Sequence, residues 1–136
     1  MFFVNHGGRL RRFFLNPQFW HNNFLVYNFF ISFTLLLLTW GEIAWALFAL
    51  RGGTFFSLHY SIYFGVDWLG EANDLFLFST FATIVLILNY ALSNFFYESK
   101  RILSYFLTCS TSLIEIIVTV STGLVIYINW ASSTSI

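Results

Sequence analysis

The stretch FLVYNFFISFTLLLLTWGEIAWALFAL, residues 24–50, is long and apolar enough to form a membrane-spanning helix. A helix needs about 20 mostly apolar residues to cross about 30 Å of hydrocarbon. Two further runs meet the same criterion, at residues 75–97 and 102–130. We therefore predict an all-α membrane protein with three transmembrane helices.

The composition of the chain supports this class. Hydrophobic residues make up 58% of the 136 residues and charged residues 9%, against about 25% charged residues in soluble domains. Six Lys+Arg balance six Asp+Glu, and no basic stripe suggests a nucleic-acid partner. The single cysteine, Cys109, cannot form a disulfide within the chain. A water-exposed globular fold is excluded because too few polar residues are available to cover it.

The loop charges predict the orientation of the spans. Basic residues gather on two segments, the N-terminal one before the first span and the short turn at 98–101: Arg9, Arg11, Arg12, Lys100 and Arg101. The loop at 51–74 is mainly acidic and the tail at 131–136 carries no charged side chain. By the positive-inside rule, we expect the N-terminus inside and the C-terminus outside, in a bacterial or organelle inner membrane. The alternative, a signal peptide ending at residues 44–46, would exceed the usual length of about 15 to 30 residues.

The N-terminal segment, residues 1–23, mixes aromatic residues with Arg, Asn and His, and Pro17 interrupts it. This composition suits the headgroup layer of a membrane, where rings and charges are both satisfied. We therefore expect an interfacial N-terminal segment. A disordered tail is the weaker alternative, because such tails hold few aromatic residues.

Each predicted span carries small or polar residues at helical spacing. They are Asn28, Ser32, Leu35, Thr39, Glu42, Ala46 and Ala49 in the first, Ser79, Ala82, Leu86, Asn89 and Ser93 in the second, and Tyr105, Thr108, Ser112, Glu115, Thr119 and Thr122 in the third. Helices in lipid associate through close packing and hydrogen bonds. We expect these stripes to face one another, with Thr111, which lies off the stripe, contributing less.

Two acidic residues lie inside the predicted spans. At about 1.5 Å per residue, Glu42 lies about 12 Å from the outer end of its helix, and Glu115 and Asn89 lie about 22 and 21 Å deep. We expect Glu115 to be protonated and hydrogen-bonded to Asn89 or to a Thr, because an unpaired carboxylate there costs at least about 2.5 to 3.5 kcal/mol. Two interpretations stay open, a polar contact between helices and a proton-carrying carboxyl group. The predicted polar cluster is Glu42, Asn89, Ser112, Glu115 and Thr119.

The loop at 51–74 contains thirteen residues, 56–68, in which apolar and polar side chains alternate strictly. This pattern predicts an extended, strand-like segment in an extracytoplasmic loop. An isolated strand must fold back as a hairpin, lie along the membrane or pair with another chain. We predict an interaction strand whose candidate contact residues are His59, Tyr60, Tyr63 and Asp67. His59 and Asp67 would lie about 26 Å apart if the strand did not turn, for example at Gly65.

Residues 58–70, LHYSIYFGVDWLG, resemble a motif of the form LHYxIYFGxDxxG in small three-span bacterial membrane proteins. In those proteins too a span follows the motif, and a short basic turn leads to a final span. The resemblance extends over residues 58–129. It implies an architecture and carries no activity to this chain.

Sequence signatures of enzymes are absent. The chain contains no HExxH, CxxC, GxSxG or phosphate-binding loop, and its histidines lie outside the spans. We expect no catalytic residue, no metal and no cofactor, and the sequence identifies no small-molecule substrate. The expected function is that of a non-catalytic subunit or interaction protein in a larger membrane assembly, in contact with lipid, other membrane-protein subunits or further copies of itself. The alternative is a small oligomeric proton or ion pathway that uses Glu115.

Overall fold

Three long helices make up most of the protein. The computed structural model describes residues 16–49, 56–61, 65–70 and 72–133. The long helices are α3 (Asn23–Ala49), α4 (Phe76–Phe96) and α5 (Arg101–Ser133). At about 1.5 Å per residue each covers about 30 Å or more, and each is apolar enough to cross a membrane. The prediction of three helices long and apolar enough to span a membrane is confirmed, with boundaries within a few residues of those expected.

The helix connections at one end of the bundle follow from local sequence. The short helix α2 (Pro17–Trp20) is capped by Asn16, whose side chain accepts a hydrogen bond from the Gln18 amide. Pro17 occupies the first helical position, where its missing N–H is not needed. His21 and Asn22 then separate α2 from α3, and the side-chain oxygen of Asn22 accepts a hydrogen bond from the Phe24 amide at 3.1 Å. Of the predicted interfacial segment, residues 1–15 lie outside the described residues. The rest is a short helix whose Phe19 is buried, packed below the long helices.

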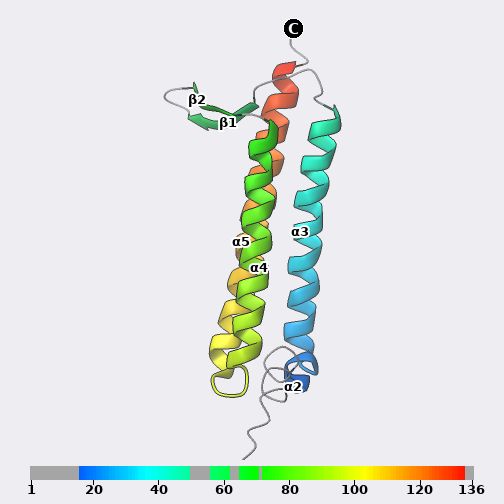
Figure 1. The fold of residues 1–136 in the computed structure, drawn as a ribbon, viewed down its shortest axis with the longest axis vertical. Coiled ribbons are helices and arrows are strands. Elements are labelled where there is room, and N and C mark those ends of the chain that lie inside the picture. Colours follow the sequence, from blue (N-terminus) through cyan, green and yellow to red (C-terminus); the bar gives the residue numbers. More distant parts are fainter. Residues whose placement is uncertain (1–15, 50–55, 62–64, 71, 134–136) are drawn as a thin grey trace, which may run out of the picture.

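The direction of the helices can be read from their contacts. Asn28 bonds to Ser112, and Thr39 bonds to Thr119 further along both helices, so α3 and α5 run in the same direction. The turn that follows α4 reverses the chain, and α4 and α5 therefore pack antiparallel, side by side. Figure 1 shows α3 alongside this pair, with α2 and the α4–α5 turn at one end and the C-terminus at the other.

A two-stranded antiparallel hairpin stands at the C-terminal end of the bundle. Strand β1 (Phe56–Ser61) pairs with β2 (Gly65–Gly70), and a short 3₁₀ helix, η1 (Ala72–Leu75), leads into α4. Three arrangements were left open for the strand-like residues 56–68, and the structure has one of them, two strands paired as a hairpin. Pairing gives each strand hydrogen-bonding partners that one long strand would lack. In Figure 1 the hairpin projects sideways, and β1 contacts α5.

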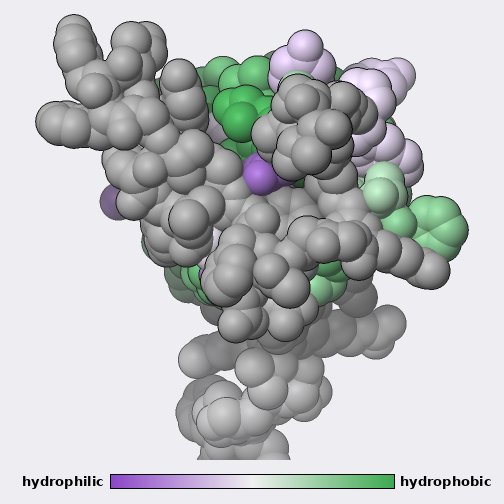
Figure 2. Space-filling view, turned by 90° about the horizontal axis from the view of Figure 1, so that it is seen from above, coloured by the Kyte–Doolittle hydropathy of each residue, from purple (hydrophilic) through white to green (hydrophobic). Residues whose placement is uncertain are grey.

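The interior of the described helices holds polar as well as apolar residues, whereas the outer faces are mainly apolar. The buried interior includes Ser32, Thr39, Ser79 and Glu115, all with 0% of their surface exposed. Large apolar side chains cover the outer faces of all three long helices, for example Phe30, Ile87, Leu113, Ile117 and Leu124. Viewed from the hairpin end, the coloured side chains at the rim are mainly apolar or weakly polar (Figure 2). Such a distribution suits a surrounding of lipid, where the outer face needs no polar groups.

Candidate functional site

The polar side chains of α3 and α5 bond to each other in steps along the contact between these helices. In the middle of the bundle, Ser112 lies 2.8 Å from Ser32 Oγ and donates to Asn28 Oδ1, also at 2.8 Å. One level further toward the hairpin end, the hydroxyls of Thr39 and Thr119 lie 2.9 Å apart. We call this set of contacts the α3–α5 seam. The predicted stripes of the first and third spans therefore do face each other, and Ser112 and Thr119 lie where they were expected.

Glu42 completes the α3–α5 seam near the hairpin end. Its carboxyl group packs over Gly123 of α5, so close that a β-carbon built on Gly123 would lie 3.4 Å from Glu42 Oε1. Glu42 Oε2 and the hydroxyl of Thr122 are buried without a hydrogen-bond partner among the described residues. Glu42 as a whole is only partly buried. It is a polar group at the edge of the bundle interior.

Glu115 lies in the interior of the chain's own bundle. It is 0% exposed, and both carboxyl oxygens lack a hydrogen-bond partner within the described part of the chain. Thr119 donates to the backbone carbonyl of Glu115 at 2.8 Å and leaves its carboxyl group free of that bond. The prediction that Glu115 bonds to Asn89 or to a Thr is therefore wrong for the residues that the structure describes.

The rotation of α4 explains why Asn89 is not the partner. The buried positions of this helix include Leu86, Tyr90 and Ser93, whereas Asn89 is only partly buried. Steps of three and of four residues both fit a helical stripe, so periodicity after Leu86 allows either position 89 or 90. In the structure it is Tyr90 that faces the interior. Its large aromatic ring packs edge-on against Phe29 of α3, with the ring centroids 5.0 Å apart.

Tyr90 brings α4 to the same level as the central contacts of the α3–α5 seam. Its hydroxyl lies beside Ser32 and Asn28 and within electrostatic range of Glu115. The hydroxyl of Tyr90 and the side-chain nitrogen of Asn28 are buried, and neither meets the geometry of a hydrogen bond to any described residue. Polar groups of α3 and α4 thus meet at Tyr90, and Glu115 of α5 lies within electrostatic range of its hydroxyl.

The contact between α4 and α5 is built differently. The hydroxyl of Ser93 donates to the backbone carbonyl of Ser104 at 3.0 Å, and that of Ser104 donates to the carbonyl of Ser93 at 2.6 Å. Both residues are 0% exposed. Thr111 is also 0% exposed and donates to the Leu107 carbonyl. The expectation that Thr111 contributes less is wrong as regards burial, because α5 packs against two helices and its buried face is wider than one stripe.

A second polar cluster lies at the α2 end of the bundle. The side-chain amide of Asn22 donates to Tyr105 Oη at 2.6 Å and to Tyr97 Oη at 3.1 Å. Asn16 donates to Glu98 Oε1 at 3.2 Å. These bonds hold the start of α3 against the turn between α4 and α5. Asn22 precedes the predicted stripe of the first span, and its role was missed in the sequence.

The predicted interaction strand is described only through its backbone. His59 pairs with Trp68 and Tyr60 with Val66, with an irregular register between Ser57 and Tyr60. Asp67 therefore lies next to the partner of His59, so the distance of about 26 Å for an unbent strand does not apply. Tyr63 lies outside the described residues, as do the side chains of His59, Tyr60 and Asp67.

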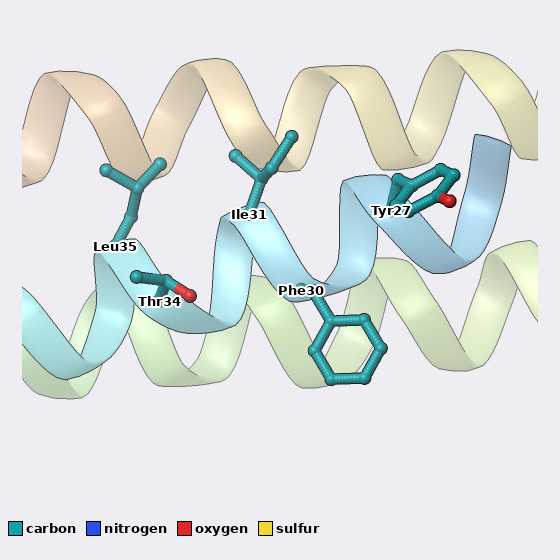
Figure 3. A pocket seen from close by; sticks show the side chains of 5 residues that line it. All are labelled: Tyr27, Phe30, Ile31, Thr34 and Leu35. Carbon is teal, nitrogen blue, oxygen red and sulfur yellow. The ribbon is translucent and has the colours of Figure 1, made fainter. Parts of the chain in front are cut away.

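The described part of the chain has open surface hollows but no cluster of metal ligands. Among the residues that the structure describes, no three His, Cys, Asp or Glu side chains lie close enough together to hold a metal ion. Figure 3 shows an open hollow along the outer side of α3, lined by Tyr27, Phe30, Ile31, Thr34 and Leu35. Ile31 and Leu35 point toward α5 and Phe30 points to the other side (Figure 3). An open, apolar hollow on one helix is the surface that a lipid chain would contact.

No protein-family model, curated protein or solved structure matches this chain. Its function is therefore inferred from its own residues.

Proposed function

We propose that this protein is a non-catalytic subunit of a larger membrane assembly and that the β1–β2 hairpin is its contact with a neighbouring subunit. The observation that carries the proposal is the hairpin itself: its two strands pair with each other and with no third strand among the described residues. An isolated two-stranded hairpin has marginal stability in water, and its outer edges can accept a further strand. The partner we propose is a membrane protein that adds a strand there.

The position of Glu115 supports this function over an oligomeric proton or ion pathway. A pathway shared by several copies would need the carboxyl group on the outer face of each bundle, pointing at a common axis. Glu115 is 0% exposed inside a single chain. The outer faces of the long helices instead present large apolar side chains, which would line such an axis poorly.

The orientation that we propose has the N-terminus inside and the hairpin and C-terminus outside. Its support is that α2 contacts the α4–α5 turn, as the bond from Asn16 to Glu98 illustrates. Lys100 and Arg101 thus lie at the end of the bundle where α2 begins. That end should face the positively charged side of the membrane.

Cysteine labelling tests this orientation. In a Cys109→Ser background, a cysteine at Ser57 should react with a membrane-impermeant thiol reagent added from outside. A cysteine at Ser99, exposed in the turn, should react only after permeabilisation. The reverse pattern would overturn the orientation.

Site-specific photocrosslinking tests the hairpin contact. A photoreactive phenylalanine analogue at Tyr60 should give one discrete protein adduct in native membranes, and the same analogue at the exposed Phe30 of α3 should mainly label lipid. Replacing residues 56–70 by a Gly/Ser linker of equal length should release the protein from its assembly on a native gel. Hairpin adducts restricted to lipid, or unchanged gel mobility of the linker variant, would reject the proposal.

A further inference from the structure

The centre of the bundle contains buried polar groups that need partners. Glu115 is 0% and Tyr90 8% exposed. The two Glu115 oxygens, the Tyr90 hydroxyl and the Asn28 side-chain nitrogen all lack hydrogen-bond partners among the residues that the structure describes. A buried polar group without a partner costs about 1 to 3 kcal/mol, and a group in lipid has no bulk water to turn to. Several such groups close together would lower the stability of the fold considerably if no molecule bonded to them.

These groups converge from the three long helices. The hydroxyl of Tyr90, on α4, lies beside Asn28 and Ser32 of α3 and within electrostatic range of Glu115 on α5. Ser112, one turn before Glu115, is bonded to both Asn28 and Ser32. Glu115 is therefore on the same side of α5 as a residue that touches α3 directly.

No positive charge is available to pair with Glu115 in the described chain. Lys100 and Arg101 are exposed at the start of α5, far along the helix from Glu115. Tyr90 on α4 is within electrostatic range of both Glu115 and Cys109 of α5. On the α3 side the neighbours of this level are the uncharged Asn28 and Ser32. The site thus combines hydrogen-bond donors and acceptors without a counterion.

We propose that Glu115, Tyr90 and Asn28 form a binding site for internal water in the middle of the bundle. A buried water makes about three hydrogen bonds, within a range of two to four, to polar groups that are otherwise unsatisfied. The carboxyl oxygens of Glu115 supply acceptors, the Asn28 amide is a donor, and the Tyr90 hydroxyl can act as either. The water joins α3, α4 and α5 at one point, and this role is independent of any partner at the hairpin.

Water-edited solid-state NMR in lipid bilayers tests the site in the intact protein. Magnetisation from water should reach the Glu115 carboxyl carbon and the Tyr90 ring despite their burial. Ala82 and Ala46, which are also 0% exposed but belong to apolar clusters, serve as controls and should receive none. Assignment of the Glu115 signal follows from its loss in Glu115→Gln.

Variants separate water binding from general damage to the fold. Tyr90→Phe keeps the ring that packs against Phe29 and removes only the hydroxyl, so transfer to the Glu115 carboxyl should fall while the helices persist. Glu115→Leu should abolish transfer to the Tyr90 ring. Glu115→Gln, which keeps hydrogen-bonding capacity, should preserve it.

Three results would overturn the proposal. The first is absence of water transfer to Glu115 in the wild-type protein. The second is a direct nitrogen-to-carboxyl contact between Asn28 and Glu115 in dipolar recoupling spectra, which would mean that the side chains satisfy each other. The third is a shift of the Glu115 carboxyl signal on exchanging NaCl for choline chloride, which would indicate a bound cation in place of water.

Discussion

The two contacts of α5 differ in how they are held together. Against α4, Ser93 and Ser104 each bond to the backbone of the other helix. Against α3, most bonds join one side chain to another, as in Ser32 with Ser112 and Thr39 with Thr119, and one weaker bond runs from Thr119 to the Leu35 carbonyl at 3.4 Å. The first contact depends on how closely the backbones approach. The second depends on the identity of both partners.

The covalent connections explain this difference. A short turn joins α4 to α5 and sets their alignment before any side chain acts. Nothing comparable aligns α3 with α5, since the whole of α4 and the hairpin lie between them in the chain. Lipid gives helices no hydrophobic reason to associate, so specific side-chain pairs must set the register of α3. In this protein the tethered pair α4 and α5 meets at small serine residues, whereas α3 and α5 meet through matched polar pairs.

The largest effect is expected where the backbones approach most closely. Ser104→Leu removes the hydroxyl that bonds to Ser93 and forces a larger side chain into a fully buried position. Overpacking costs about 1 to 3 kcal/mol and a lost interhelical hydrogen bond about 0.6 kcal/mol. We expect a loss of about 3 kcal/mol in the free energy of unfolding, measured by SDS titration in mixed micelles.

The control for this substitution is Ser99→Leu, because Ser99 is exposed in the α4–α5 turn. Its effect should stay within about 0.5 kcal/mol. Similar losses at positions 99 and 104 would mean that close approach does not hold α4 and α5 together.

A smaller effect is expected in the α3–α5 seam, where the identity of both partners matters. Thr39→Val and Thr119→Val keep the shape of the side chains and remove the bond between them. In a double-mutant cycle the two sites should show a coupling of about 0.6 kcal/mol, up to about 1.7 kcal/mol. The same unfolding titration measures it.

Thr34 is the matched control for this cycle, because it is an exposed threonine on α3. Thr34→Val combined with Thr119→Val should show additive effects. Coupling to Thr34 as strong as to Thr39 would remove the distinction between tethered and untethered helices.

The smallest effect concerns two glycines that differ only in their surroundings. A β-carbon at Gly41 would meet nothing within 4 Å, whereas one at Gly123 would meet the Glu42 carboxyl at 3.4 Å. Alanine is favoured over glycine in a helix by about 1 kcal/mol. Gly41→Ala should therefore stabilise the protein, and Gly123→Ala should stabilise it by about 0.5 kcal/mol less, since the new methyl group meets the Glu42 carboxyl at the short limit of ordinary van der Waals contact. Equal gains from the two substitutions would show that Glu42 is not held against Gly123.

The fold was easier to predict than the site for a reason visible at positions 89 and 90. Helical spacing allowed either residue to face inward, and polarity favoured Asn89. The structure buries Tyr90, because packing against Phe29 decides the rotation of α4. Thr111 is a second case. It is buried because α5 packs against both α3 and α4, and one stripe of residues in the sequence could not show this.

The sequence by itself determined the number, length and approximate ends of the three long helices. Each apolar run can form a spanning helix without help from the others, because a helix satisfies its backbone hydrogen bonds within its own segment. Only the tertiary structure decided which polar residues meet, that Glu115 is buried inside the bundle, and that residues 56–61 and 65–70 form two paired strands. Those outcomes depend on helix rotation and strand pairing, which arise from contacts between residues far apart in the chain.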